Sequence, residues 1–465
     1  MSAAACALIG RALLFRYGAY DSRALGCVLG AGLCVLVAVG FAGKLDWRRL
    51  SLRSEVLLAW ALAALTIYEL RLGWSDGPFH TAGELQRSQQ LLAGLGLGAV
   101  LAASSRRSAV RWMSLGLVTT SAAALFALLL SAVPPPFIDV IMFQDEGARA
   151  LLSLHNPYSL RFPNIYGHPW YYGSALVDGA RLKFGFPYPP ASLMLSTLGY
   201  AIAADHRWAQ AAAVLLSGLL MGLGGGRIGV LMAAVMFATP RGLFVVECGW
   251  TEPFAVACLC AVAFLESRHS RWTLPALGLF WAIKQYVVLT IPLAWLLLPD
   301  AQRSSLVAWA TLRTRWSESW SGSWRVLAWL LGPAALITLP FVLWDPKSFW
   351  FDMVSLHFYH PFREDALSLL AFWARRGTPV LPNVLGFLGC GLAMAIALWR
   401  APRSVSGFCA ATGLTLLAFF VVNKAAFANY YYLVLGCFAC AAAFAFAGAS
   451  YDEPRWIDDC SPPPR

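Results

Sequence analysis

The sequence predicts an all-α protein that crosses a membrane many times. Hydrophobic residues make up 59% of the 465 residues and charged residues 13%, whereas a soluble domain is about half apolar and about a quarter charged. The apolar residues also form runs close to the ~20 residues that a helix needs to cross the hydrocarbon layer. Only helices or closed barrels can cross it, and these runs are too long and unbroken for barrel strands. The strongest runs lie at 24–43, 113–133, 326–344, 379–399, 405–422 and 430–449.

Weaker apolar runs raise the predicted number of transmembrane helices to roughly 13, within a range of about 11–14. The stretch ACALIGRALLF at 5–15 is not counted, because it is short and Arg11 interrupts it. It also has no small-residue cleavage site, so it does not predict a removable signal peptide. The weaker runs are 55–70, 90–104, 189–204, 209–223, 227–241, 252–267 and 273–298.

The basic residues predict how the chain is oriented. The net charge is +11, but the lysines and arginines lie in short loops and form no continuous face, so nucleic-acid binding is not predicted. Because cytoplasmic loops carry an excess of Lys and Arg, the basic loops 44–53, 104–111, 312–316 and 400–404 are predicted to be cytoplasmic. Counting helices between them places two long loops on the extracytoplasmic side of the cell membrane. They are the first long loop, 134–188, and the second long loop, 345–378, followed by a short outer turn at 423–429.

The chain divides into three predicted parts. Residues 1–112 form additional N-terminal transmembrane helices, residues 113–449 carry both long loops, and residues 450–465 form a cytoplasmic tail. No internal repeat is apparent. Most of the 11 cysteines lie inside apolar runs, which indicates small buried side chains rather than a disulfide framework or a zinc site.

The first long loop begins with an unusual concentration of acids. The segment DVIMFQDEGARALL follows Pro134–Pro136 and predicts a helix that lies along the membrane surface. Asp139 falls in its first turn, where the helix dipole alone would favour an acid. Glu146, seven residues later, shares a face with Asp139 about 10 Å along the axis. Asp145 lies on another face, four residues before Arg149, which predicts an exposed ion pair.

The first long loop resembles a known enzyme family in the order and spacing of its residues. The pattern D-x3-F…ARALLSLHNPY…FPYPP is similar to the first outer loop of the GT-C superfamily of membrane glycosyltransferases. It is most similar to the bacterial polyprenyl-phosphate-mannose-dependent mannosyltransferases, over roughly residues 113–449. Two features depart from that family: about three extra helices precede the loop, and Phe143 occupies a position where Tyr is common.

The resemblance implies roles for individual residues. It implies that Asp139 is the catalytic base, that a basic residue in a later span corresponds to Lys284, and that a His or Arg of the later outer loop is functional. Glu146 would either orient a sugar hydroxyl or face water. Substrate-binding positions are implied where the NPY and YPP motifs match, at Asn156, Tyr158 and Tyr188.

Cations that could hold the donor phosphate follow in later loops. His357, His360 and Arg363 recur at a helical spacing of three in the second long loop, where an imidazolium or guanidinium would neutralise a departing phosphate. They could equally be polar surface, with Arg363 paired to Glu364 or Asp365. Lys424 could contact the phosphate or extend toward the membrane surface. Lys284 could meet the donor head group or pair with Glu247 or Glu252.

The predicted reaction needs a single carboxylate. A glycosidase uses two because its leaving alcohol is poor, whereas polyprenyl phosphate leaves readily. One base at Asp139 would then take the proton of the acceptor hydroxyl, and direct displacement would invert the anomeric carbon. The resemblance implies a polyprenyl-phosphate sugar as donor, with mannose the expected sugar, and a lipid or glycan as acceptor in contact with membrane lipids.

No cofactor is predicted. Asp139, Asp145 and Glu146 are oxygen ligands that suit Mg²⁺ or Mn²⁺, but Asp145 points away from the other two on a helix. Two other functions compete with the enzyme. A transporter or flippase for lipid-linked sugars would also have many spans, although such proteins often show inverted repeats. A structural subunit of an envelope complex would leave the acids of the first long loop unexplained.

Overall fold

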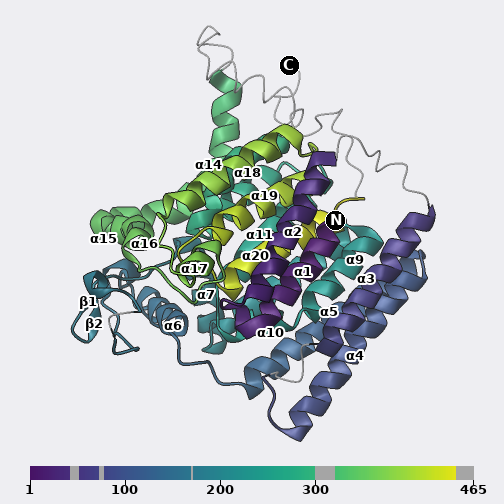
Figure 1. The fold of residues 1–465 in the computed structure, drawn as a ribbon, viewed down its shortest axis with the longest axis horizontal. Helices are drawn as coiled ribbons and strands as arrows, with labels where there is room; N and C mark the ends of the chain where they lie inside the picture. The colour runs from purple at the N-terminus through teal and green to yellow at the C-terminus, as the bar shows by residue number, and fades with distance from the viewer. Residues whose placement is uncertain (42–51, 73–77, 169–170, 299–319, 447–465) are drawn as a thin grey trace, which may run out of the picture.

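The computed structural model describes residues 1–41, 52–72, 78–168, 171–298 and 320–446 (Figure 1). Three of the predicted cytoplasmic segments fall at least partly outside the described residues. They are most of the loop 44–53, the whole of 312–316, and the tail 450–465.

The described residues confirm the all-α prediction. Their only strands are β1 (Val177–Asp178) and β2 (Arg181–Leu182), which pair antiparallel within the first long loop. The helices of the first half are α1 (Ser2–Leu14), η1 (Phe15–Gly18), α2 (Ser22–Phe41), α3 (Leu52–Leu72), α4 (Ala82–Ser104), α5 (Ser108–Ala132), α6 (Asp139–Leu152), η3 (Pro157–Ser159), η4 (Ser174–Leu176), α7 (Pro190–Ala203) and α8 (Arg207–Gly224). Those of the second half are α9 (Gly226–Ala238), α10 (Pro240–Glu247), α11 (Glu252–Ser267), α12 (Thr273–Ala282), η5 (Gln285–Leu296), α14 (Trp320–Trp344), α15 (Pro346–Trp350), η6 (Phe351–Ser355), α16 (Leu356–Tyr359), α17 (Leu369–Ala374), α18 (Val384–Arg400), α19 (Val405–Val421) and α20 (Ala428–Ala443).

Some of these helices could span a membrane. By length and composition, three described helices are long and apolar enough: Ser22–Phe41, Ser108–Ala132 and Val326–Trp344. A fourth candidate is the pair Gly226–Ala238 and Arg241–Glu247, which is bent by 65°. The other apolar helices are shorter, such as α18, α19 and α20 with 17, 17 and 16 residues. The apolar helices thus indicate a membrane protein, and the larger number of spans remains a prediction.

The structure shows how two of the less certain apolar segments pack. The uncounted stretch 5–15 lies in α1 and η1; α1 packs against α2 and α20, and the Cys6 thiol lies 3.6 Å from the Leu435 carbonyl oxygen. The run 189–204 forms α7, which has 14 residues, about 21 Å, and packs along α6. The turn after α7 returns to the first long loop, where His206 Nδ1 lies 2.7 Å from Asp145 Oδ1.

The predicted span 273–298 is broken in the middle. Helix α12 ends at Ala282, and Lys284 has the extended conformation φ −149°, ψ 139°. The chain continues as the 3-10 helix η5, which contains Pro292. A proline cannot donate to the helical ladder, so the sequence favours a tighter, irregular helix here. The break exposes backbone groups beside Lys284 and places this lysine between two helix ends.

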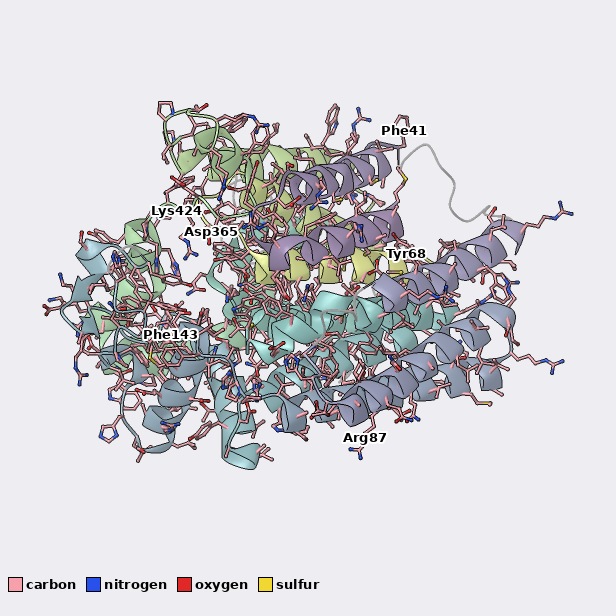
Figure 2. All side chains as sticks on the ribbon, turned by 60° about the horizontal axis from the view of Figure 1, so that its bottom comes forward. Phe41, Tyr68, Arg87, Phe143, Asp365 and Lys424 are labelled. Carbon is pink, nitrogen blue, oxygen red and sulfur yellow. The ribbon has the colours of Figure 1, made fainter. Side chains whose placement is uncertain are left out.

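The two long loops lie side by side at one end of the molecule. Figure 1 shows α6, β1 and β2 next to α15 and α16, on the side away from α3 and α4. Two hydrogen bonds join the loops: the Gly185 N–H donates to Asp352 Oδ2 at 3.0 Å, and the Ser159 hydroxyl donates to Asp345 Oδ2 at 2.9 Å. Phe143, Asp365 and Lys424 lie on the same side of the molecule in Figure 2.

A separate hydrophobic cluster holds this end together. It is built mainly from aromatic side chains of the first long loop, and Phe341 of α14 and Leu356 of α16 close it. Phe143 packs edge-on against Phe162, with ring centroids 4.9 Å apart. Phe143, the residue that departs from the family pattern, therefore acts as a packing residue of this cluster.

Candidate active site

Asp139 is the first residue of α6. It follows three prolines, and Ile138 at the N-cap position has no side chain that could cap the helix. The half-buried carboxylate accepts three hydrogen bonds, all from neutral donors. Oδ2 accepts from the Tyr172 hydroxyl at 3.0 Å, while Oδ1 accepts from the Val140 N–H at 2.9 Å and the Tyr166 hydroxyl at 3.3 Å.

The surroundings make Asp139 a stronger base than an ordinary aspartate. Burial raises the pKa of the Asp139 carboxyl, while the bonds from Tyr172, Val140 and Tyr166 and the positive charge of Arg363 hold that rise back. A carboxylate with a raised pKa, bound by neutral donors rather than by a cation, can still accept a proton.

Three tyrosines connect Asp139 to the second long loop. We call Tyr166, Tyr171 and Tyr172 the tyrosine cluster. The rings of Tyr166 and Tyr171 lie 4.0 Å apart, and the Arg363 guanidinium lies over the Tyr171 ring at 4.5 Å. The cluster thus places a cation within electrostatic reach of Asp139 without a direct ion pair.

The two predicted histidines of the second long loop lie beside the tyrosine cluster. His360 contacts the Tyr172 ring at 6.4 Å and the His357 ring at 6.3 Å. The His357 side chain is exposed and that of His360 is half-buried. Partial desolvation by the surrounding protein lowers the pKa of His357 to about 4, with Lys284 and Lys424 adding to the effect, and lowers the pKa of His360 to about 3. Both rings are therefore neutral at pH 7, so the predicted imidazolium is not the form present.

Arg363 and Lys424 supply positive charge but are also structural. Arg363 pairs with Asp365 through Nε and Nη2, at 2.8 and 2.7 Å, which is the alternative that the sequence left open. The Lys424 ammonium donates to the carbonyl oxygens of Phe358 at 3.2 Å and His360 at 2.5 Å. Lys424 therefore fixes the turn that carries the histidines, rather than extending toward the membrane surface.

Lys284 lies at the break between α12 and η5 and pairs with Glu252. Its ammonium is 3.0 Å from Glu252 Oε1 and 2.6 Å from the Thr251 hydroxyl. Glu252 Oε1 also accepts from the Tyr286 hydroxyl at 2.7 Å and from Asn429 Nδ2 at 2.9 Å. The predicted pairing with Glu252 is thus observed, and this pair sits within electrostatic reach of His357.

The residues implied as substrate contacts occupy different positions. The Tyr188 ring faces the Lys284 ammonium at 4.4 Å, so Tyr188 borders the site. Tyr158 is 1% exposed and donates to the Tyr188 carbonyl at 2.7 Å. Asn156 Oδ1 accepts from the Tyr158 N–H at 3.0 Å. Asn156 and Tyr158 therefore support Tyr188 from behind, while Glu146 is half-buried and accepts no hydrogen bond from the described part of the chain.

The predicted ion pair between Asp145 and Arg149 is replaced by other contacts. Asp145 bonds to the His206 ring, and Arg149 donates to the Tyr200 hydroxyl at 2.7 Å. His206 lies on the turn after α7, 61 residues away, so spacing within α6 could not indicate it. Among the described residues, no three His, Cys, Asp or Glu side chains are grouped so that they could hold a metal ion.

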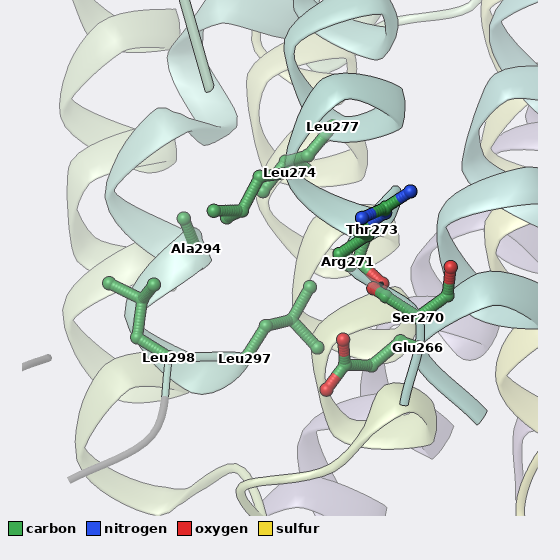
Figure 3. A pocket seen from close by; sticks show the side chains of 9 residues that line it. All are labelled: Glu266, Ser270, Arg271, Thr273, Leu274, Leu277, Ala294, Leu297 and Leu298. Carbon is green, nitrogen blue, oxygen red and sulfur yellow. Dashed lines mark hydrogen bonds between the residues drawn. The ribbon is translucent and has the colours of Figure 1, made fainter. Parts of the chain in front are cut away.

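One pocket lies far from these residues. Figure 3 shows it between the start of α12 and the end of η5, lined by leucines together with Glu266, Ser270 and Arg271. Its volume is about 10 Å³, enough for about one water molecule. It lies at the opposite ends of α12 and η5 from Lys284, and the predicted site residues lie outside this pocket.

Sequence reasoning missed the partners of Asp139. Spacing alone could not show that Tyr166 and Tyr172 reach back 27 and 33 residues to the Asp139 carboxylate. It also missed Asp352, which joins the long loops. The sequence does offer one indication of its role, because Asp352 is a single acid within the apolar stretch FWFDMV. No family model, curated protein or solved structure matches this chain.

Proposed function

We propose that this chain is a membrane glycosyltransferase of the GT-C type. It would move a sugar, mannose by its resemblance, from a polyprenyl-phosphate donor to a lipid or glycan acceptor at the extracytoplasmic face. The observation that carries the proposal is the Asp139 carboxylate, which is half-buried, bound only by neutral donors and within electrostatic reach of Arg363. The sequence resemblance names the same residue as the base.

The residues divide the reaction between them. The acceptor oxygen attacks the anomeric carbon, the bond from that carbon to the phosphate oxygen breaks, and the acceptor proton passes to Asp139. The departing polyprenyl phosphate takes the electron pair, and Arg363 and the Lys284 side of the site stabilise its charge. His357 and His360, neutral at pH 7, would donate N–H hydrogen bonds to phosphate oxygens rather than supply charge.

The broken helices favour transport of a lipid-linked sugar as the second candidate. Transporters often bind substrates where helices are interrupted, and both α9–α10 and α12–η5 are interrupted here. However, the second break lies beside Glu252 and Tyr188, at the same end as the long loops. A polar site at one end of the helices suits an enzyme that works at a membrane face. A transporter would be expected to bind its substrate near the midplane of the membrane.

The replacement Asp139→Asn separates the two candidates. In proteoliposomes supplied with polyprenyl-phosphate mannose and acceptor lipid, we expect transfer to fall by about 10²–10⁴-fold, the usual contribution of a general base. Donor binding should be retained, because the amide keeps the size and one acceptor oxygen. Asp178→Asn is the matched control, since it makes the same change at an exposed acid of the same loop. Full transfer by the Asp139→Asn variant would refute the assignment, and loss of donor translocation by that variant would favour the transporter.

A further inference from the structure

A second polar site lies at the far end of α5 from Asp139. It is a cleft of about 540 Å³ lined by Val56 and Trp60 of α3, by residues 103–107 between α4 and α5, and by Arg227 of α9. Arg107 precedes α5 and Asp139 follows it, and a 25-residue helix is about 37 Å long. The cleft is therefore separate from the candidate active site.

The cleft has an excess of positive charge. Arg106, Arg107 and Arg227 line it, whereas Glu55 is the carboxylate that pairs with two of them. Arg106 bonds to Glu55, and Arg227 Nη1 lies 3.8 Å from Glu55 Oε1. Three guanidinium groups against one carboxylate leave room for a further anion.

Arg227 points to a ligand independently of this charge excess. Its side chain is 9% exposed, and Nε donates to the carbonyl oxygen of Ala102 at 2.8 Å while Nη2 donates to that of Ala103. These bonds cap the end of α4 and fix the guanidinium. Nη1 is buried and makes no hydrogen bond with any described residue, although a buried donor on a charged group normally has an acceptor.

The N-terminus of α5 adds to the preference for an anion. The first N–H groups of a helix have no partner within it, and the N-cap residue Arg107 provides no side-chain acceptor for them. Trp60, which is 46% exposed, forms an apolar part of the lining. Tryptophan is enriched at the level of lipid head groups, and basic pockets between membrane helices bind anionic head groups.

We propose that this cleft binds the phosphodiester head group of an anionic phospholipid. The guanidinium of Arg227 and those of Arg106 and Arg107 hold the phosphate, and Trp60 lies against the glycerol and the first acyl carbons. A zwitterionic lipid carries a cation that the arginines repel, so the cleft discriminates against it. The exposed tryptophan distinguishes a lipid from a free phosphate ion.

Thermal unfolding of the full chain in detergent tests the proposal, with phosphatidylglycerol, phosphatidylcholine of the same acyl chains, or inorganic phosphate added. We expect phosphatidylglycerol to raise Tm and the other two to raise it little.

Three variants test which residues hold the lipid. Arg106→Gln/Arg107→Gln should weaken phosphatidylglycerol binding by on the order of tenfold or more. Glu55→Gln should strengthen it, because it frees two arginines, and mere structural damage would not do so. Arg400→Gln, which changes an arginine stacked on the exposed Trp399 away from the cleft, should have no effect.

A variant that is less stable even without lipid would confuse the Tm comparison. For such a variant, native mass spectrometry measures directly how much of each lipid stays bound to the protein. Equal retention of both lipids would overturn the proposal. So would unchanged retention of phosphatidylglycerol by the double variant. Equal protection by inorganic phosphate would show that the cleft takes the phosphate group alone, which would also overturn the assignment to a lipid.

Discussion

Two carboxylates at the same end of the molecule have opposite surroundings. Asp139 lies on a loop-built site and receives hydrogen bonds from two tyrosines and one backbone N–H. Glu252 begins a helix of the bundle, is 0% exposed, and contacts the Lys284 ammonium directly. The first carboxylate has neutral partners and partial access to water, whereas the second has a cation and no access.

Under the proposed function, this difference separates the proposed base from a structural acid. A cation in direct contact stabilises the charged form of a carboxylate and makes it a poor base. Neutral donors orient Asp139 while leaving it able to take up a proton. We therefore expect the chemistry to depend on Asp139 and the stability of the fold to depend on Glu252.

The largest effect should come from Glu252→Gln. It leaves Lys284 buried without a counter-charge, which typically costs about 3–5 kcal/mol of folding stability. Thermal unfolding in detergent measures the loss. Asp139→Asn should not lower Tm, because it removes a buried charge that has no ion-pair partner. The double variant Glu252→Gln/Lys284→Met should recover much of the loss, and a double variant as unstable as the sum of the single ones would break the comparison.

A third carboxylate sharpens the comparison through its pH dependence. Burial raises the pKa of Asp352 to about 8, against about 4 in an unfolded chain. The folded state therefore binds this proton more tightly. Its stabilising contribution is complete below pH ~4 and is lost as the pH rises to ~8. We expect the free energy of unfolding to fall across this window, by about 1.4 kcal/mol for each unit by which the folded pKa exceeds the unfolded one.

Asp352→Asn should remove that slope while keeping an acceptor for the Gly185 N–H. Unfolding measured at several pH values between 4 and 8 would show the difference. Asp345→Asn is a control of opposite sign, because hydrogen bonds from Ser348 lower the pKa of Asp345. An Asp352→Asn variant with the same pH slope as the original chain would contradict the assignment.

The smallest effect should come from Tyr172→Phe. It removes one hydrogen bond to the charged form of Asp139, worth about 1.5 kcal/mol, while Tyr166 and Val140 keep theirs. The pKa of Asp139 should rise further, so the acidic limb of the pH profile of kcat/KM moves to higher pH. Tyr200→Phe changes a hydroxyl bonded only to Arg149 among the described residues. An acidic limb at the same pH in the Tyr172→Phe and Tyr200→Phe variants would show that Tyr172 does not act on Asp139.

The sequence was informative where a property depends on composition or short spacing. Long apolar runs predicted a helical membrane protein, and the position of Asp139 after three prolines predicted the start of α6. The pairing of Lys284 with Glu252 was among the alternatives, because few partners exist for a cation in so apolar a chain.

Contacts over long distances in the chain were not predictable. The tyrosines that hold Asp139, the His206 partner of Asp145 and the carbonyl partners of Lys424 come from segments 27 to 66 residues away. The neutral state of His357 and His360 was also missed, since it depends on how much protein surrounds each ring. The break at Lys284 was hidden because residues on both sides of it are equally apolar.

Gly185 has a consequence for how such chains can diverge. A methyl group on its Cα would stand 2.3 Å from the Tyr158 carbonyl oxygen and 2.7 Å from Asp352 Oδ2, closer than any real side chain allows. Position 185 therefore cannot accept a larger residue while the two loops remain joined in this way. In homologous chains that keep this contact, we expect a glycine at the position of Gly185 together with an acid at the position of Asp352.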